Sequence, residues 1–384
     1  MRRIRFTFAG QAECRKKASP GRFVVIVSCH VIREAQDLPV KEPSEQQNRK
    51  GAFLVVVIPA YNEEMTISEV ISRVPRHIAG ISEVRVLVVD DGSTDRTREL
   101  ALAAGAAVMT HRVNRGVGSA YRTGVEKALA MGADIIVNMD ADGQFNPADI
   151  PTLIGPILRG EAGFVTASRF KDPALVPDMS PVRLWGNRMM SRLISRITGW
   201  RLHDVSCGFR ACSRDVALSL NLWGAFTYTQ ETFLDLAFKG VEPVEIPLVV
   251  RGEREHGKSR VARNLWSYGH RAFLIIMRAY RDYWPWNFFS RLAFASFAIA
   301  ACLGGFLLYW RITHKSFSPH LWSGFVGGFF AMIGMFCLLM GLVGEMLKSI
   351  RLNQERMLYY LRKRHLEKLG NESGANGERQ GVDE

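Results

Sequence analysis

The chain has 384 residues and a formal net charge of +13, from 50 Lys and Arg against 37 Asp and Glu. That length holds one large domain plus a smaller part, and the positive excess favours an anionic partner: nucleic acid, an acidic membrane surface or a phosphate-bearing substrate. The six cysteines form no CxxC pairs, which excludes a zinc site of paired cysteines and predicts reduced thiols in a cytosolic setting.

Residues 1–50 carry eleven Lys or Arg, five Asp or Glu and one short apolar stretch, FVVIVSC. A secretory signal peptide needs a longer apolar segment and a small-residue cleavage site. This part of the chain is therefore expected to be a mostly disordered extension.

Between residues 51 and 170, short aliphatic runs alternate with amphipathic stretches of helical spacing. This alternation is typical of parallel strands that helices cover on both faces, so it predicts an α/β fold with a doubly wound, mostly parallel sheet. Ligands of such sheets bind beyond the carboxyl ends of the strands. The predicted strands are residues 53–58, 84–89, 106–110, 134–139 and 163–168.

Carboxylates follow three of these strands directly, in the segments PAYNEE (59–64), DDGSTD (90–95) and DADGQ (140–144). A helix start alone explains DDGSTD, because Asp, Ser and Thr are common N-cap residues. Three acidic strand ends at one edge, however, are costly unless a cation or a ligand compensates their charge. Asp140 and Asp142 are therefore predicted to bind a hard divalent cation, Mg²⁺ or Mn²⁺, with Gln144 adding a neutral oxygen.

The segment GVGSAYRTG (116–124) resembles part of a dinucleotide-binding loop, but Tyr121 stands where the third glycine is required. The sequence GxxxxGK[ST] of a P-loop occurs nowhere in the chain. Neither fingerprint is therefore predicted, and a phosphate-bound metal at the sheet edge indicates nucleotide-linked chemistry instead.

Two uncharged segments, residues 292–310 and 321–344, are long enough to cross a membrane, which takes about 20 apolar residues. Ten residues separate them, so they predict a helical hairpin. Buried helices of a soluble domain are the alternative, which the lengths and the Gly, Ala and Ser content disfavour. Basic flanks place the soluble domain and both termini in the cytoplasm, although Arg311 and Lys315 in the connecting loop weaken the asymmetry.

Residues 262–291 combine Trp and Tyr with Arg, as both nucleic-acid-binding surfaces and helices at a membrane interface do. The adjacent spans favour the membrane interface, so no nucleic acid is expected as a partner. The predicted organisation is an extension (1–50), an α/β domain (51–250), a mobile basic loop with interfacial helices (251–291), two spans (292–347) and a basic, then disordered, tail (348–384).

Three motifs carry a family resemblance by their order and spacing: VVVIPAYNEE, VLVVDDGSTDRT and MDADGQFNPADI. They resemble the nucleotide-sugar-binding half of the family 2 glycosyltransferases, which have the GT-A fold. The later segments, followed by two spans, are similar to the polyisoprenyl-phosphate glycosyltransferases, such as the dolichyl-phosphate mannose or glucose synthases. These segments are ASRF (167–170), DVSCGFR (204–210), FTYTQE (226–231) and RGEREHGKSR (251–260).

This resemblance covers residues 53–345 and implies a metal-dependent, inverting enzyme of the cytoplasmic membrane face. Such an enzyme moves a sugar from a UDP- or GDP-linked donor to a polyprenyl phosphate, undecaprenyl or dolichyl. The implied nucleotide-sugar-binding residues are Pro59, Tyr61, Glu63, Val89, Asp91, Asp140, Ala141 and Asp142, and the implied metal ligands are Asp140, Asp142 and Gln144.

The resemblance also implies catalytic roles for Asp142, Arg169, Arg183, Arg254, Arg260 and Glu231. Arg169 and Arg183 would face the lipid phosphate, and Arg254 and Arg260 would clamp the phosphates. Two positions depart from the pattern: Arg260 stands where dolichyl-phosphate mannose synthases often have Lys, and Asn187 stands where a small hydroxyl residue is expected. These departures affect the contacts to the acceptor, not the reaction class.

Glu231 has two interpretations, a general base for a hydroxyl acceptor or a group that positions sugar hydroxyls or arginines for a phosphate acceptor. The second is favoured because the phosphate is already ionised near pH 7. Asp204 is expected to fix its loop, and Arg210 to be a surface residue or to pair with the acidic cluster.

Two rival classes stay open. A membrane polysaccharide synthase-like enzyme with a hydroxyl acceptor would carry QxxRW, which is absent, and a non-catalytic scaffold would have a broken metal site. The sequence also leaves open a homo-oligomer assembled through the spans.

Overall fold

The computed structural model describes residues 51–380 except 222–227, 252–273, 275–276 and 279. The predicted N-terminal extension, Arg254, Arg260 and most of the predicted 251–291 segment therefore lie outside the described residues.

The described part contains a seven-stranded mixed sheet, with strands β1 (Ala52–Ala60), β2 (Ile81–Asp90), β3 (Ala107–Thr110), β4 (Ile135–Asn138), β5 (Phe164–Ser168), β6 (Arg210–Ser213) and β7 (Val244–Pro247). Their order is β3-β2-β1-β4-β6-β5-β7. β1 pairs in parallel with β2 and β4, and β2 with β3, so four strands end at one edge. β6 is antiparallel to β4 and β5, while β5 and β7 are parallel.

The predicted mostly parallel α/β sheet is confirmed, and each of the five predicted strands overlaps an observed one. The pattern missed β6 and β7, because neither is a continuous aliphatic run. β6 inserts between two strands that are parallel to their other neighbours, which makes the sheet mixed.

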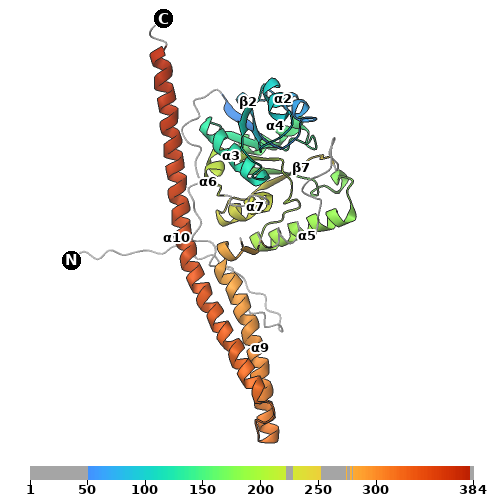
Figure 1. Cartoon of the computed structure of the whole chain (residues 1–384), viewed down its shortest axis with the longest axis vertical. Coiled ribbons are helices and arrows are strands. Elements are labelled where there is room, and N and C mark those ends of the chain that lie inside the picture. The colour runs from blue at the N-terminus through green and yellow to red at the C-terminus, as the bar shows by residue number, and fades with distance from the viewer. Residues whose placement is uncertain (1–50, 222–227, 252–273, 275–276, 279, 381–384) are drawn as a thin grey trace, which may run out of the picture. The chain divides into compact units, whose positions relative to one another are not determined.

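Helices cover both faces of the sheet (Figure 1), with α1 (Ile67–Ser72), α2 (Thr97–Ala103) and α4 (Ile150–Leu158) on one face and α3 (Val117–Ala130) and α6 (Arg214–Ser219) on the other. Side chains alternate across a strand. Accordingly, Leu54 and Val56 of β1 belong to the apolar cluster of α1, α2 and α4, whereas Val55 and Val57 belong to the cluster that contains α3. Short 3-10 helices span Pro147–Asp149 and Pro173–Leu175.

A third apolar cluster joins α5 (Pro181–Thr198) to α7 (Tyr228–Phe238) and to the segment before the next long helix. Ile194 of α5, Phe233 of α7 and Tyr283 are all buried in it. The α5 and α7 helices therefore pack as a pair at one side of the sheet.

Two long helices follow, α9 (Pro285–His314) and α10 (Leu321–Gln380), which run side by side (Figure 1). Each is long and apolar enough to cross a membrane, as the sequence predicts. In the most apolar 18-residue stretch of each helix, only 11% (α9) and 22% (α10) is buried within the chain. Such exposure is expected of helices whose apolar surface meets lipid.

The predicted disordered tail is replaced by helix, because α10 continues to Gln380. Residues 345–368 are rich in Leu, Met, Glu, Lys and Arg, which favour helix. Extending an existing helix also needs no new nucleus, so the turn-forming residues that follow do not end it at once.

Two glycines in helices give opposite predictions for stability. A Cβ at Gly124 of α3 would overlap the Val57 side chain and lie 3.2 Å from Val89 Cγ2, whereas a Cβ at Gly186 of α5 would meet nothing within 4 Å. Gly124→Ala should destabilise the fold by about 1–3 kcal/mol through overpacking. Gly186→Ala should stabilise it by about 0.5–1 kcal/mol, because alanine loses less backbone entropy in a helix. Thermal unfolding of the purified full chain measures both changes, and equal shifts would contradict the close packing of α3 on β1.

Candidate functional site

The loops that follow β1 and β2 are joined by hydrogen bonds between side chains and backbone amides. The Asn62 amide donates to Ser93 Oγ at 2.9 Å, and the Thr94 amide donates to Asn62 Oδ1 at 2.8 Å. Asn62 has a φ of 52°, in the left-handed region that Asn tolerates better than most residues. These bonds fix the half-buried side chains of Tyr61 and Glu63 at the carboxyl edge of the sheet.

The two carboxylates at the end of β2 point inward. Asp91 is buried and accepts the backbone amides of Arg115 at 3.0 Å and Gly116 at 2.8 Å, and His111 Nδ1 lies 2.7 Å from its Oδ1. Asp90 Oδ1 accepts its own loop's Ser93 amide at 2.9 Å. Asp91 thus anchors the loop before α3, and its predicted contact with base or ribose stays a prediction. Pro59 and Val89 are buried and pair with each other one residue before the ends of β1 and β2.

The loop after β4 holds Asp140, Ala141, Asp142 and Gln144 in a tight turn at Gly143, whose φ is 73°. Asp142 Oδ1 accepts the Gln144 amide at 3.1 Å, and the Ala141 carbonyl accepts the Thr66 hydroxyl at 2.7 Å. The turn therefore sets both carboxylates at the tip of β4.

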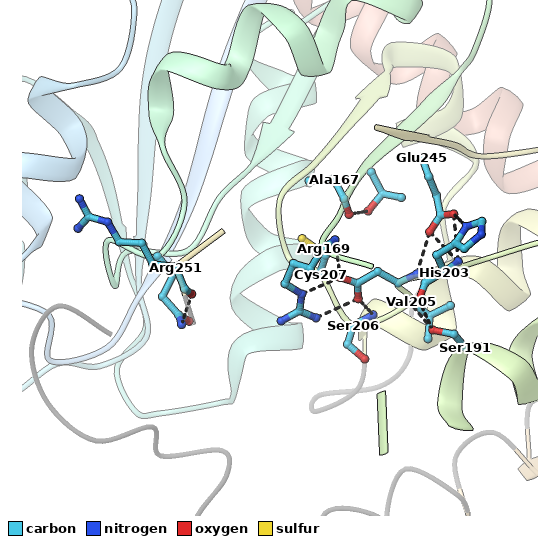
Figure 2. Close-up of polar contacts among 12 residues, drawn as sticks. Ala167, Arg169, Ser191, His203, Val205, Ser206, Cys207, Glu245 and Arg251 are labelled. Carbon is cyan, nitrogen blue, oxygen red and sulfur yellow. Dashed lines mark hydrogen bonds and ion pairs between the residues drawn. The ribbon is translucent and has the colours of Figure 1, made fainter. Parts of the chain in front are cut away.

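Arg251 continues this loop's hydrogen bonding across the sheet. Gln144 Nε2 donates to the Arg251 carbonyl at 3.1 Å, and the Arg251 amide donates to the Gln144 carbonyl at 3.1 Å (Figure 2). A cavity of about 520 Å³ borders this side of the loop, and its lining includes Arg73 and Arg251. The lining also includes Asp149, so Gln144 lies between the acidic tip of β4 and a cavity wall of mixed charge.

Asp140 lies against Gly208 of the neighbouring chain segment. A Cβ at Gly208 would come within 2.9 Å of Asp140 Oδ2, so only glycine leaves room for this carboxylate. The Gly208 carbonyl in turn accepts Asn138 Nδ2 at 2.8 Å. The close approach keeps the Asp140 carboxylate at the strand tip.

The residues present fit a divalent cation that also binds a substrate. Within residues 51–221, 228–251 and the helices that follow, no three His, Cys, Asp or Glu side chains form a metal-binding group. Asp140, Asp142 and Gln144 supply only oxygen donors, and Mg²⁺ or Mn²⁺ commonly takes one or two carboxylates and completes its coordination with phosphate and water. The donor set therefore suits a metal shared with a diphosphate.

Arg169 forms a bidentate ion pair with Asp204; Figure 2 labels Arg169 and draws its hydrogen bonds as dashed lines. Arg169 Nε donates to Asp204 Oδ2 at 2.6 Å and Nη2 donates to Oδ1 at 2.9 Å, with the carboxylate fully buried. Burial disfavours the guanidinium charge, but Asp204 and, more weakly, Asp140 outweigh it and raise the pKa of Arg169. Arg169 is thus a permanent, oriented positive charge near the β4 carboxylates.

Glu245 of β7 accepts hydrogen bonds from the backbone that carries Asp204, a role that the sequence did not reveal. It accepts the Asp204 amide at 2.8 Å and the His203 amide at 3.0 Å, and its Oε2 lies 2.7 Å from His203 Nδ1. A single Glu in a short strand gives no signal in sequence. The expectation that Asp204 fixes its loop is confirmed, because Asp204 Oδ1 accepts the backbone amide of Ser206. The same carboxylate also binds the Arg169 guanidinium.

Arg210 corrects the expectation of a surface residue, because it is 1% exposed. Its guanidinium donates to the carbonyls of Cys207 at 2.7 Å, Val205 at 3.2 Å and Thr229 at 2.9 Å, and it lies 4.8 Å from the Phe233 ring. Burial lowers the pKa of Arg210. This side chain joins the 204–210 loop to the first turn of α7.

The first turn of α7 carries Glu231, which is buried, and begins at Tyr228 beside the end of β4. Asn138 Nδ2 lies 3.3 Å from the Tyr228 hydroxyl. Asn138 is the last residue of β4, and Ser168 is the last residue of β5. The buried atoms Asn138 Oδ1 and Ser168 Oγ have no hydrogen-bond partner within the described part of the chain. Buried polar atoms are rarely left unpaired, which makes these two candidate ligand contacts that sequence reasoning missed.

The structure does not join every predicted residue to this centre. Arg183 is exposed in the first turn of α5, and its side chain makes no hydrogen bond or ion pair with the described residues. Its predicted contact with a lipid phosphate stays a prediction, as do those of Arg254 and Arg260.

The α/β domain is similar to known proteins. Residues 55–220 match the model of the family described as Glycosyl transferase family 2. A solved structure of glucosyl-3-phosphoglycerate synthase from Mycobacterium tuberculosis, with Mn²⁺ and UDP, is 25% identical over 60% of this chain and 80% of that chain, with a TM-score of 0.47.

Two curated relatives are similar over most of their own length. The UDP-N-acetylglucosamine–dolichyl-phosphate N-acetylglucosaminyltransferase of Methanococcus voltae is 34% identical over 42% of this chain and 70% of the relative. The polyprenol monophosphomannose synthase of Mycolicibacterium smegmatis is 32% identical over 54% of this chain and 80% of the relative. With the carboxylate-bearing strand tips in the order that the family motifs predict, the chain belongs to glycosyltransferase family 2.

Proposed function

We propose that this protein transfers a sugar from a nucleoside diphosphate sugar to a polyprenyl phosphate, with inversion at the anomeric carbon. The observation that carries the proposal is the Arg169 guanidinium, which Asp204 holds close enough to Asp140 of the β4 loop to interact with it electrostatically. A cation site and a fixed guanidinium together suit two anionic substrates that must approach each other. The relatives named for dolichyl phosphate and polyprenol support the lipid acceptor.

On the donor side, Asp140, Asp142 and Gln144 would hold Mg²⁺ or Mn²⁺, which supplies Lewis-acid stabilisation of the leaving diphosphate when bound. Pro59, Tyr61, Glu63, Val89, Asp91 and Ala141 would contact the nucleotide sugar. Asn138 and Ser168 bring unpaired buried oxygens to the same strand ends, which suits hydrogen bonds to donor hydroxyls.

On the acceptor side, Arg169 would neutralise the lipid phosphate, with Arg183 and the arginines at 254 and 260 adding positive charge. A phosphate monoester has a second pKa of about 6, so its oxygen is already an anionic nucleophile near pH 7. It attacks the anomeric carbon in line with the departing diphosphate, which gives inversion in a single displacement. The chain's own residues orient and neutralise the reactants rather than remove a proton.

The acceptor's lipid tail places the reaction at a membrane. The two apolar helices α9 and α10 would span it, with the α/β domain and both termini in the cytoplasm. The basic residues that flank the helices support this orientation.

Metal-dependent transfer tests the proposal directly. The purified full chain should move radiolabel from one member of a panel of UDP- and GDP-sugars into a chloroform-extractable phospholipid, and EDTA should abolish the transfer. Asp142→Asn should lower the rate by about 100-fold or more, because electrostatic stabilisation of the leaving group is lost.

Asp134→Asn is the matched control, since Asp134 precedes the same strand at its opposite end and accepts the Phe53 amide. Its activity should remain near that of the unchanged chain. Label in a water-soluble polymer would favour the polysaccharide synthase alternative, and absence of transfer from every donor would overturn the proposal.

The role of Glu231 follows from the acceptor's ionisation. Glu231→Gln should lower the transfer rate by less than about tenfold, because a phosphate acceptor needs no general base, whereas loss of a true base costs about 10²–10⁴-fold. Single-turnover rates between pH 6 and 9 measure this. A loss of the larger size, together with disappearance of the acidic limb of the pH profile, where the rate rises with pH as a base loses its proton, would assign Glu231 as the base.

A further inference from the structure

The part of α10 that follows the predicted span 321–344 presents an apolar stripe that no described part of the chain covers. The members of this stripe are Met346, Ile350, Asn353, Met357 and Tyr360. The four apolar members are exposed by 70%, 53%, 64% and 55%, in chain order, and Asn353 is exposed as well. Intervals of four and three residues alternate along the stripe, so its members lie on one side of the helix. An exposed apolar stripe of this kind indicates a contact surface.

The opposite face of the same helix segment packs on the α/β domain through polar groups. The Tyr359 hydroxyl donates to Asp215 Oδ1 at 3.3 Å, and Arg362 Nη1 donates to the Leu218 carbonyl at 3.2 Å. A surface helix ordinarily turns its apolar face to the core and its polar face to water. Because this arrangement is reversed in α10, we expect the stripe to have a partner of its own.

Lipid cannot reach the far end of the stripe. Met357 is 13 residues beyond Gly344, where the predicted span ends. This separation is about 20 Å along the helix axis, or about 15 Å along the membrane normal at a tilt of about 40°. The headgroup layer adds only about 5–8 Å on each side of the hydrocarbon core. The partner of the stripe is therefore expected to be protein.

The same spacing begins inside the predicted span. Phe336, Leu339 and Val343 precede Met346 at intervals of three, four and three residues, and all three are exposed. A strict alternation of three and four residues is the pattern by which helices stay in contact over many turns. One continuous seam can therefore run from the span into the stripe.

A second copy of this chain fits this seam. Two copies in one membrane share their orientation, so their α10 helices run parallel. Asn353 is the one polar member of the stripe, and a single polar residue in a coiled-coil seam sets its register at a cost in stability. The neighbouring Leu347, Gln354 and Leu361 are uncharged, so a symmetric contact opposes no like charges at these positions.

We propose that the α10 helices of two copies pack in parallel along this stripe and form a coiled-coil dimer just beyond the membrane. Each α/β domain stays on the opposite face of its own α10, so the contact leaves the bonds of Tyr359 and Arg362 intact. The inference rests on the proposed membrane location of the chain but not on its transferase activity.

Disulfide cross-linking of the full chain in proteoliposomes tests the proposal. The starting chain carries Ala in place of Cys14, Cys29, Cys302 and Cys337. It keeps Cys207 and Cys212, because they are 1% and 2% exposed and burial raises the pKa of each thiol to about 12.

Met357→Cys then places a thiol in the stripe, and Leu358→Cys is the matched control. Leu358 is also an exposed apolar residue of α10, but its side chain points about 100° away from that of Met357. Mild oxidation should join most of the Met357→Cys chains into dimers, with a yield that does not change when more lipid dilutes the protein. Leu358→Cys should give severalfold less dimer, and dilution should lower its yield, because only collisions join these thiols.

Ile350→Glu combined with Met357→Glu should place like charges across the seam and convert the dimers to monomers, which photobleaching of single labelled chains counts. Both side chains are exposed in the single chain, so the circular dichroism of the variant should not change. Neither measurement needs a substrate, so their outcome is independent of the proposed reaction.

Equal cross-linking of Met357→Cys and Leu358→Cys chains would overturn the proposal. So would dimers that survive the two glutamates, because the contact would then lie elsewhere, for example in the spans. Monomers of the unchanged chain would overturn it as well, because a different protein or another part of the same chain would then have to cover the stripe.

Discussion

Repulsion between acidic side chains at one sheet edge is the constraint on which the site depends. The parallel strands β1, β2 and β4 all deliver carboxylates to that edge. Backbone amides compensate one part of this charge, since Asp90 and Asp91 accept the amides of their own and neighbouring loops. These bonds turn the β2 carboxylates into anchors and leave the β4 pair, Asp140 and Asp142, at the tip where a cation would meet a diphosphate.

Arg169 and Arg210 are both largely buried, but their partners differ, and so do the roles that we infer for them. Arg169 is paired with a buried carboxylate and stays protonated, at a raised pKa. Arg210 has carbonyl oxygens and aromatic rings around it instead, and its pKa is lowered. Arg210 therefore stabilises the loop that carries Asp204, and Asp204 orients Arg169. Removing a partner from such a buried set leaves unpaired polar groups, at about 1–3 kcal/mol each.

Sequence patterns predicted the parts of the fold that are local. Strands β1, β2 and β4 are largely aliphatic, and charged residues follow each of them in a short segment. Both features, and the edge at which the strands end, could therefore be predicted. The antiparallel insertion of β6 and the Asp204–Glu245 bond could not, because they join residues 41 or more positions apart without periodicity. Arg210 was misplaced for the same reason: its hydrogen-bonding carbonyls belong to the backbone, which carries no residue-type signal.

The helix that carries Glu231 is also bonded to the helices that are expected to enter the membrane. Near the end of α7, Lys239 Nζ lies 2.6 Å from Asp235 Oδ2 and 3.7 Å from Glu355 of α10. The Tyr283 hydroxyl donates to Asp235 Oδ1 at 3.2 Å and accepts Arg351 Nη2 at 3.0 Å. Removing one member of such a buried charge set is destabilising by about 3–5 kcal/mol, because the others stay buried and unpaired. A desolvated polar network thus joins α7 of the α/β domain to α10 and to the segment that precedes α9.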